Sequence, residues 1–124
     1  MSLLLLSAYS ELTRLEFYLA RRDFEGLYQR IRKQPMEEKH TSSPSTEQIC
    51  AAVDLACAWY WKHVLCLQRS AATVCLLKRH GVRALLVMGV QQVPFRAHAW
   101  VEVGGRVAND KPYVPDVYAV LDRL

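Results

Sequence analysis

The order of the hydrophobic patterns constrains the fold most strongly, because helical spacing ends at Gly81 and strand patterns follow it. Before Gly81, apolar residues recur at three- and four-residue steps. After it, aliphatic and β-branched residues fill Val82 to Val90, and Phe95 to Val103 shows a period of two. This separation predicts an α+β fold in which helices pack on an antiparallel sheet.

Four helices are expected, over Leu3 to about Ala20, Phe24 to Lys33, Ser45 or Thr46 to about Lys62, and Cys66 to about His80. The third is apolar nearly all round and should be deeply packed. Strands are expected over Val82 to Val90, Phe95 to Val103 and Arg106 to Asp110, with the first in the sheet interior. The last segment, Tyr118 to Leu124, is predicted to be a short helix or strand.

A polar stretch, residues 37–45, separates the first two helices from the rest. It has no hydrophobic pattern and is expected to form an exposed linker. A chain of 124 residues suits one domain. We therefore expect a single compact unit, made of an N-terminal helical segment with the start of the linker, residues 1–40, and a core of residues 41–124.

The composition is that of a globular protein, with 52% hydrophobic and 23% charged residues. The net charge of +4 has its excess in the first third of the chain, where a solvated helix face explains it better than an acidic partner. The sequence has no nucleic-acid-binding motif, no apolar run of membrane-spanning length and no signal-peptide pattern. We expect a cytoplasmic protein that binds neither nucleic acid nor membrane.

The four cysteines are separated by seven, nine and nine residues, which fits no CxxC zinc or redox pattern. They should be reduced thiols, and Cys50 and Cys57 are expected to fill the core. A zinc site of Cys50, Cys57, Cys66 and a histidine is possible in principle but lacks paired ligand spacing. No metal and no other cofactor is expected.

Cys66 is the candidate nucleophile because it stands where a helix should begin. Unpaired N–H groups and the positive end of the helix dipole favour a thiolate there. A free thiol has a pKa of about 8.5, and a helix start with a cationic neighbour can lower it to about 3.5–7.5. The alternative for Cys66 is a buried structural thiol.

His98 is the candidate base, on the strand face opposite Ala97 and Ala99, whose small side chains leave room for a partner. His63, three residues before Cys66, is a second candidate without an evident orienting carboxylate.

Asp110 is the candidate orienting carboxylate, and the turn before it decides its position. A two-residue Gly104-Gly105 turn would place Asp110 opposite Ala99, on the wrong face. A three-residue loop that includes Val103, or an equivalent bulge, would place it across from His98. We expect the three-residue loop, with Asp110 orienting His98 for proton transfer from the thiol.

Other residues near this group are candidates for binding. Arg69, one turn after Cys66, should pair with an acidic residue or shape a substrate groove, and Trp59 and Trp100 are candidates for lining a peptide channel. Candidate oxyanion donors are the Cys66 N–H, Gln68 and Trp61.

The segments Cys66-Leu67-Gln68-Arg69-Ser70 and Ala97-His98-Ala99-Trp100-Val101-Glu102, with the later Asn109-Asp110, resemble the transglutaminase-like B proteins of lasso-peptide biosynthesis. The similarity extends over roughly Ala51 to Tyr118. It implies a papain- and transglutaminase-like α+β fold, and Cys66, His98 and Asp110 correspond to the family's catalytic triad.

The resemblance further implies a bacterial leader peptidase. Family members remove the leader of a ribosomally made precursor peptide and free the core for an ATP-dependent lasso cyclase. The short N-terminal part resembles the stand-alone type, which works with a separate leader-binding protein, and the helices between Leu3 and Lys33 would either dock that partner or complete the fold. Two rivals remain, acyl transfer to an amine by the same triad and a non-catalytic peptide-binding protein.

Overall fold

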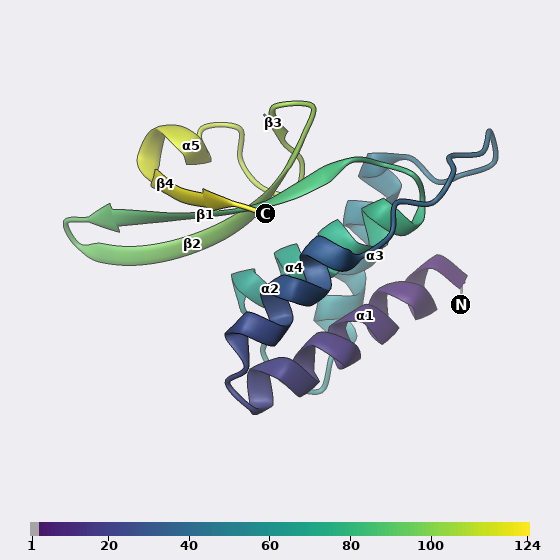
Figure 1. Ribbon diagram of the computed structural model, residues 1–124, viewed down its shortest axis with the longest axis horizontal. Helices are drawn as coiled ribbons and strands as arrows, with labels where there is room; N and C mark the ends of the chain where they lie inside the picture. Colours follow the sequence, from purple (N-terminus) through teal and green to yellow (C-terminus); the bar gives the residue numbers. More distant parts are fainter. Residues whose placement is uncertain (1–2) are drawn as a thin grey trace.

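The computed structural model describes residues 3–124, and the N-terminal residues Met1 and Ser2, which open the stretch tested for a signal peptide, lie outside the described part. The helices are α1 (Leu3–Ala20), α2 (Phe24–Lys33), α3 (Thr46–Trp59), α4 (Cys66–Arg79) and the short α5 (Val114–Val117). The strands are β1 (Ala84–Gln92), β2 (Phe95–Val103), β3 (Arg106–Val107) and β4 (Ala119–Arg123). The order of elements confirms the predicted α+β fold (Figure 1).

Local signals set most helix ends. At the start of α3, the Ser45 hydroxyl accepts from the Gln48 N–H, and the Gln48 side chain accepts from the Ser45 N–H, which forms a capping box. At the start of α2, the Asp23 carboxylate accepts a hydrogen bond from the Gly26 N–H. After α4, Gly81 adopts the left-handed conformation with a φ of 78°, as predicted. The start of α4 differs, because Leu65 provides no side-chain cap.

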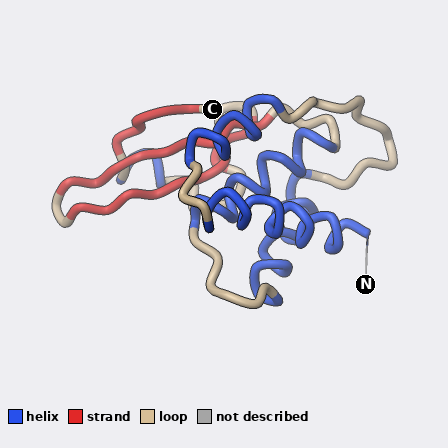
Figure 2. The backbone as a smooth tube through the Cα atoms, turned by 60° about the horizontal axis from the view of Figure 1, so that its bottom comes forward, coloured by secondary structure: helices blue, strands red, loops and turns tan. Residues whose placement is uncertain are grey.

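One hydrophobic core joins the helices to a face of the sheet. It includes Leu12 of α1, Leu76 of α4, Leu86 of β1 and Val101 of β2, all fully buried. Helices α1 to α4 form one layer and the sheet another, as the tube view also shows (Figure 2). The N-terminal helices therefore share their core with α4 and the sheet.

The prediction that α3 is deeply packed was wrong for one side of the helix. Leu55 is 49% exposed and Trp59 is 75% exposed, whereas Val53 and Ala56 are fully buried. The helix also ends at Trp59 rather than near Lys62. Within residues 3–124, only α1 and α4 pack closely against α3, so its remaining face stays open.

The sheet has the order β3-β2-β1-β4, and every neighbouring pair is antiparallel. The first predicted strand is interior, as expected, and the last segment is the edge strand β4. On the sheet face away from α4, Val87, Trp100 and Val114 form a second small core with Tyr118 packed against it.

The turn between β2 and β3 corrects the expected register. Val103 pairs with Arg106, so Gly104 and Gly105 form a two-residue turn with φ values of 60° and 78°. The expected three-residue loop was wrong, and β3 ends at Val107 rather than at Asp110. Because β3 ends at Val107, the alternation of strand side chains does not extend to Asp110. That alternation would have placed Asp110 on the sheet face opposite His98.

A buried carboxylate, Glu11, ties three helices together. Its side chain is 0% exposed and lies 3.3 to 3.4 Å from guanidinium nitrogens of Arg14, Arg30 and Arg79, on α1, α2 and α4. None of the helices in residues 3–124 combines the length and apolar character needed to cross a membrane.

Replacing Glu11 should destabilise the fold more than replacing one of its partners. We expect Glu11→Ala to lower the free energy of unfolding by about 3 kcal/mol, because it leaves partly buried guanidinium groups without their counter-ion. The matched control Arg14→Ala removes a largely exposed cation and should cost under about 1 kcal/mol. Urea unfolding of both variants measures the difference, and equal losses would contradict the structural role of Glu11.

Candidate active site

Cys66 is the first residue of α4 and is partly buried. The first backbone hydrogen bond of this helix runs from the Arg69 N–H to the Leu65 carbonyl at 3.0 Å. The N–H groups of Cys66, Leu67 and Gln68 precede it, and no side chain caps them. The thiol therefore stands beside a set of donors and a helix dipole that favour negative charge.

His98 and Asp110 are in direct contact, although the turn before Asp110 was predicted incorrectly. Nε2 of His98 lies 2.6 Å from Oδ2 of Asp110, and both side chains are about one-fifth exposed. The imidazole also stacks on Trp100 and Tyr118, with ring centroids 5.9 and 5.1 Å away. Two aromatic rings and a carboxylate thus fix the orientation of His98.

The surroundings of Asp110 favour its ionised form. Burial is the largest influence and would raise the pKa of this carboxyl, but the hydrogen bond from His98 lowers it and, with further contributions, the lowering effects together outweigh burial. The backbone N–H of Lys111, 2.7 Å from Oδ1, and the charges of His98 and Arg69 act in the same direction. The net result is a pKa below the ordinary value for an aspartate.

Hydrogen bonds fasten α4 to the strand that carries His98. The Ser70 hydroxyl donates to the Ala99 carbonyl at 3.1 Å and accepts from the Asn109 carboxamide at 3.0 Å. The carboxamide oxygen of Asn109 accepts from the Val101 N–H at 2.8 Å. All three bonds are buried, so they hold the helix, β2 and the loop before Asp110 in one arrangement.

This network places the start of α4 beside the His98–Asp110 pair. Ser70 lies four residues after Cys66, hence on the same helix face and about one turn of 5.4 Å along the axis. Arg69, three residues after Cys66, lies 4.0 Å from Oδ2 of Asp110. The structure thus places Asp110, and with it His98, near the first turn of α4, the helix that begins at Cys66.

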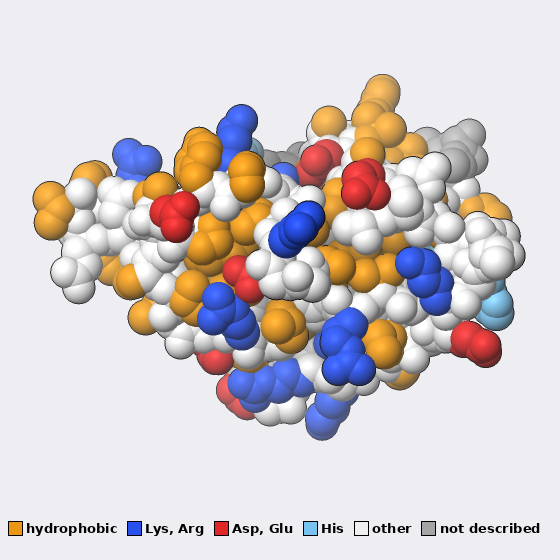
Figure 3. Space-filling model, turned by 90° about the horizontal axis from the view of Figure 1, so that it is seen from above, with side chains coloured by type: hydrophobic (Ala, Val, Ile, Leu, Met, Phe, Trp, Pro, Cys, Tyr) orange, Lys and Arg blue, Asp and Glu red, His pale blue; other side chains and the backbone are white. Residues whose placement is uncertain are grey.

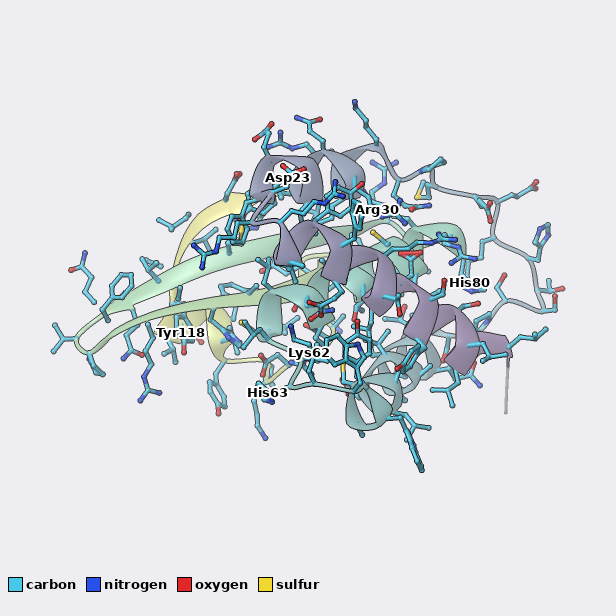
Figure 4. The ribbon with its side chains drawn as sticks, turned by 90° about the horizontal axis from the view of Figure 1, so that it is seen from below. Asp23, Arg30, Lys62, His63, His80 and Tyr118 are labelled. Atoms are coloured by element: carbon cyan, nitrogen blue, oxygen red, sulfur yellow. The ribbon has the colours of Figure 1, made fainter. Side chains whose placement is uncertain are left out.

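Ser70, Asn109 and Tyr118 are site residues that sequence analysis missed. Ser70 had a detectable signal, because it follows Cys66 at helical spacing. Asn109 precedes Asp110 directly, but its side chain replaces a strand hydrogen bond only because β3 is short. The contact of Tyr118 with His98 depends on the return of the chain after α5, which no local pattern indicates (Figure 4).

Arg69 does pair with acidic residues, one of the two roles expected for it. Its guanidinium lies 3.0 Å from Oδ1 of Asp54 on α3 and 4.0 Å from Asp110. Arg69 therefore connects Asp54 of α3 with Asp110.

Two of the remaining candidates are placed where they cannot act as predicted. Trp100 is fully buried, and its indole N–H donates to Glu102 at 3.1 Å, so it supports His98 from behind and does not line a channel. Gln68 is 2% exposed, and its amide donates to the Leu12 carbonyl at 2.9 Å, which makes it unsuited as an oxyanion donor. Both side chains complete the core rather than the site.

Trp59 and Trp61 are 75% and 70% exposed, and their predicted roles in substrate or oxyanion binding stay predictions. His63 is exposed in the loop before α4, where it lines a hollow with Glu16 and Phe24 of the helical layer (Figure 4). Asp110 is not part of that hollow, and the carboxylate that lines it, Glu16, accepts hydrogen bonds from Lys62 and Gln68.

Of the other cysteines, Cys50 and Cys75 are buried and Cys57 is partly buried. Burial, with a further contribution from Asp54 and Glu47, raises the pKa of Cys50 to about 11. Burial raises the pKa of Cys75 to about 12 and also raises that of Cys57. Within residues 3–124, no three His, Cys, Asp or Glu side chains gather as metal ligands, so the zinc alternative has no ligand set there.

A cysteine at an uncapped helix start and a strand-borne histidine that contacts an aspartate are groups suited to nucleophilic thiol chemistry. A family model described as "Transglutaminase-like superfamily" matches residues 11–123, and the chain belongs to this superfamily. The match includes α2, α3 and most of α1, so the helical layer is part of the family fold.

The chain is also similar to the microcin J25-processing protein McjB of Escherichia coli. The two are 45% identical over 59 residues, which cover 48% of this chain and 28% of the relative. The similarity therefore spans well under half the length of that protein. No solved structure shows a significant match.

Cys66 should be the fastest thiol to react in the folded protein. At neutral pH the raised pKa values of the other three thiols keep them protonated, and each pKa unit corresponds to about a tenfold change in thiolate fraction. We expect brief iodoacetamide treatment at pH 7 to label Cys66 at least about tenfold faster than Cys50, Cys57 or Cys75. Peptide mapping by mass spectrometry measures this, with urea-unfolded protein as the control in which all four react; rapid labelling of Cys50 or Cys75 in the folded protein would contradict it.

The ionised Asp110 should contribute stability that acid removes. Its pKa is lower in the folded than in the unfolded state, so the contribution is present above the unfolded pKa of about 3.9 and disappears as the pH falls through the folded pKa. We expect Asp110→Asn to be less stable than wild type at pH 7, with a smaller difference near pH 3. Urea unfolding at both pH values tests this against Asp116→Asn, an exposed control; a difference that does not change with pH would count against it.

Proposed function

We propose that this protein is a cysteine peptidase that removes the leader from a ribosomally made lasso-peptide precursor. The observation that carries the proposal is the 2.6 Å contact between His98 and Asp110 on a strand fastened to the start of α4. Membership of the transglutaminase-like superfamily and similarity to a protein named for microcin J25 processing support it.

The proposed first step is activation of Cys66. Asp110 accepts a hydrogen bond from Nε2–H of His98, which leaves Nδ1 as the proton acceptor. Nδ1 takes the thiol proton, and the resulting imidazolium is stabilised by the Asp110 carboxylate. The stacked rings of Trp100 and Tyr118 limit rotation of the imidazole during this transfer.

The thiolate then attacks the carbonyl carbon of the scissile peptide bond. The oxyanion that forms is stabilised by the uncapped N–H groups at the start of α4, with the Cys66 N–H as the first donor. His98 gives its proton to the leaving amine, and a thioester to Cys66 remains. Water, deprotonated by His98, attacks the thioester and releases the leader with a new carboxyl group.

The proposed partners are the precursor peptide, a separate leader-binding protein and an ATP-dependent lasso cyclase that uses the freed core.

The direct test incubates the chain with the precursor and leader-binding protein encoded beside it, and reads the products by mass spectrometry. We expect wild type to release the leader with the mass of one added water, and Cys66→Ala and His98→Ala to lose at least about a thousandfold in rate. Addition of an amine in place of water would identify acyl transfer. Equal products from wild type and Cys66→Ala would refute the mechanism.

A further inference from the structure

One edge of β2 is open next to His98. β2 pairs with β1 from Phe95 to Val103, but β3 pairs only with its last two residues. Beyond β3, the Ala108 N–H donates to the Val101 carbonyl at 2.8 Å, and the Asn109 carboxamide accepts from the Val101 N–H. Asn109 thus ends the ladder, and in the described part of the chain no further strand lies along the rest of this edge.

The alternation of an antiparallel strand identifies which groups face the open edge. Val101 directs both its N–H and its carbonyl toward the β3 side, so Ala99, Ala97 and Phe95 direct theirs the same way. The Ala99 carbonyl already accepts a hydrogen bond from the Ser70 hydroxyl. Among the described residues, no group pairs with the backbone of Ala97 or Phe95 on that side.

This edge is accessible and leads to the thiol. Phe95 is 72% exposed, and Arg96 and Ala97 are exposed as well. The tip of the β1–β2 hairpin projects beyond the helical layer in two views, and hydrophobic side chains gather at this end of the molecule (Figures 1, 2 and 3). Ala97 directly precedes His98, and the Ala99 carbonyl contacts the helix that begins at Cys66.

We propose that the substrate binds as an extended strand along this edge, with its main chain hydrogen-bonded to the N–H and carbonyl of Ala97. The inference rests on the proposed function, and it specifies the substrate as an unfolded peptide segment recognised through its backbone. A peptide aligned on Ala97 passes the imidazole of the next residue and reaches the start of α4. Exposed strand edges bind extended peptides by this type of pairing.

The test uses a hexapeptidyl chloromethyl ketone, in which the Cys66 thiolate displaces chloride and forms a carbon–sulfur bond. The measured quantity is the rate constant for Cys66 labelling by this reagent divided by that for iodoacetamide, which is too small to use the edge. Strand pairing uses every second residue of the peptide. We therefore expect N-methylation of alternate amides to lower the ratio about fivefold or more, and N-methylation of the intervening amides to change it less than twofold.

A variant locates the pairing on β2. Ala97→Pro removes an N–H that points away from β1, so the β1–β2 ladder keeps its hydrogen bonds, and proline is tolerated at such edge positions. We expect it to lower the ratio about fivefold. Leu121→Pro, on the opposite edge strand β4 at a residue outside the β1–β4 pairing, is the matched control and should keep the wild-type ratio. Circular dichroism checks the fold of both variants, and the N-methyl series on wild type does not depend on either.

The outcomes separate this inference from the proposed function. An alternating effect of N-methylation with a loss in Ala97→Pro supports edge binding even if no precursor is cleaved, because labelling needs no hydrolysis. A uniform effect, no effect, or an equal loss in Leu121→Pro overturns edge binding even if the precursor is cleaved through Cys66.

Discussion

The hydrogen-bonded group of Ser70, Asn109 and the β2 backbone is the interaction on which the site depends. It is buried, and each polar atom in it has a partner, so it is costly to break. A helix packed on a sheet by apolar contacts alone can slide by fractions of a turn. The directional bonds from Ser70 to Ala99 and Asn109 set the height of α4 against β2 and therefore the position of Cys66 relative to His98.

The two faces of the sheet carry different sets of side chains, one belonging to the main core and the other including His98. The face toward α4 contributes Leu86, Ala99 and Val101 to the main core. On the opposite face, the imidazole of His98 stacks on Trp100 and Tyr118, and the indole N–H of Trp100 donates a hydrogen bond to Glu102. Strand alternation alone assigns these faces, and it lets β2 serve both stability and the proposed chemistry.

Much of this architecture could be predicted from the sequence, because its signals are local. Helical spacing predicted α1, α2 and α4 nearly to the residue, the Ser45 capping box marked the start of α3, and Gly81 marked the end of α4. Cys66, His98 and Asp110 were selected from a helix start, a strand pattern and a turn. The contact of His98 with Asp110 was expected for the wrong reason, since a two-residue turn followed by an early strand end replaced the three-residue loop.

The missed features are those that depend on contacts distant in sequence. Whether Trp100 faces a channel or a core depends on Val114 of α5, which lies on this face of the sheet, and on Tyr118 and Val120, which pack there as the chain returns to the edge strand β4. The amide of Gln68 is held by Leu12, 56 residues away, and no pattern near Gln68 indicates this. The exposed side of α3 likewise reflects the number of neighbours available rather than its own composition.

The shared core has a consequence for the smallest unit that can hold the site. Leu12 and Leu15 of α1 and Leu27 of α2 are fully buried in the same cluster as Leu76 and Val101. A fragment that begins after residue 40 would keep Cys66, His98 and Asp110 but would expose the inner side of α4 to water. Helices α1 and α2 thus complete the core that supports Cys66, His98 and Asp110, and grafting these three residues into another protein would require an equivalent of the two helices.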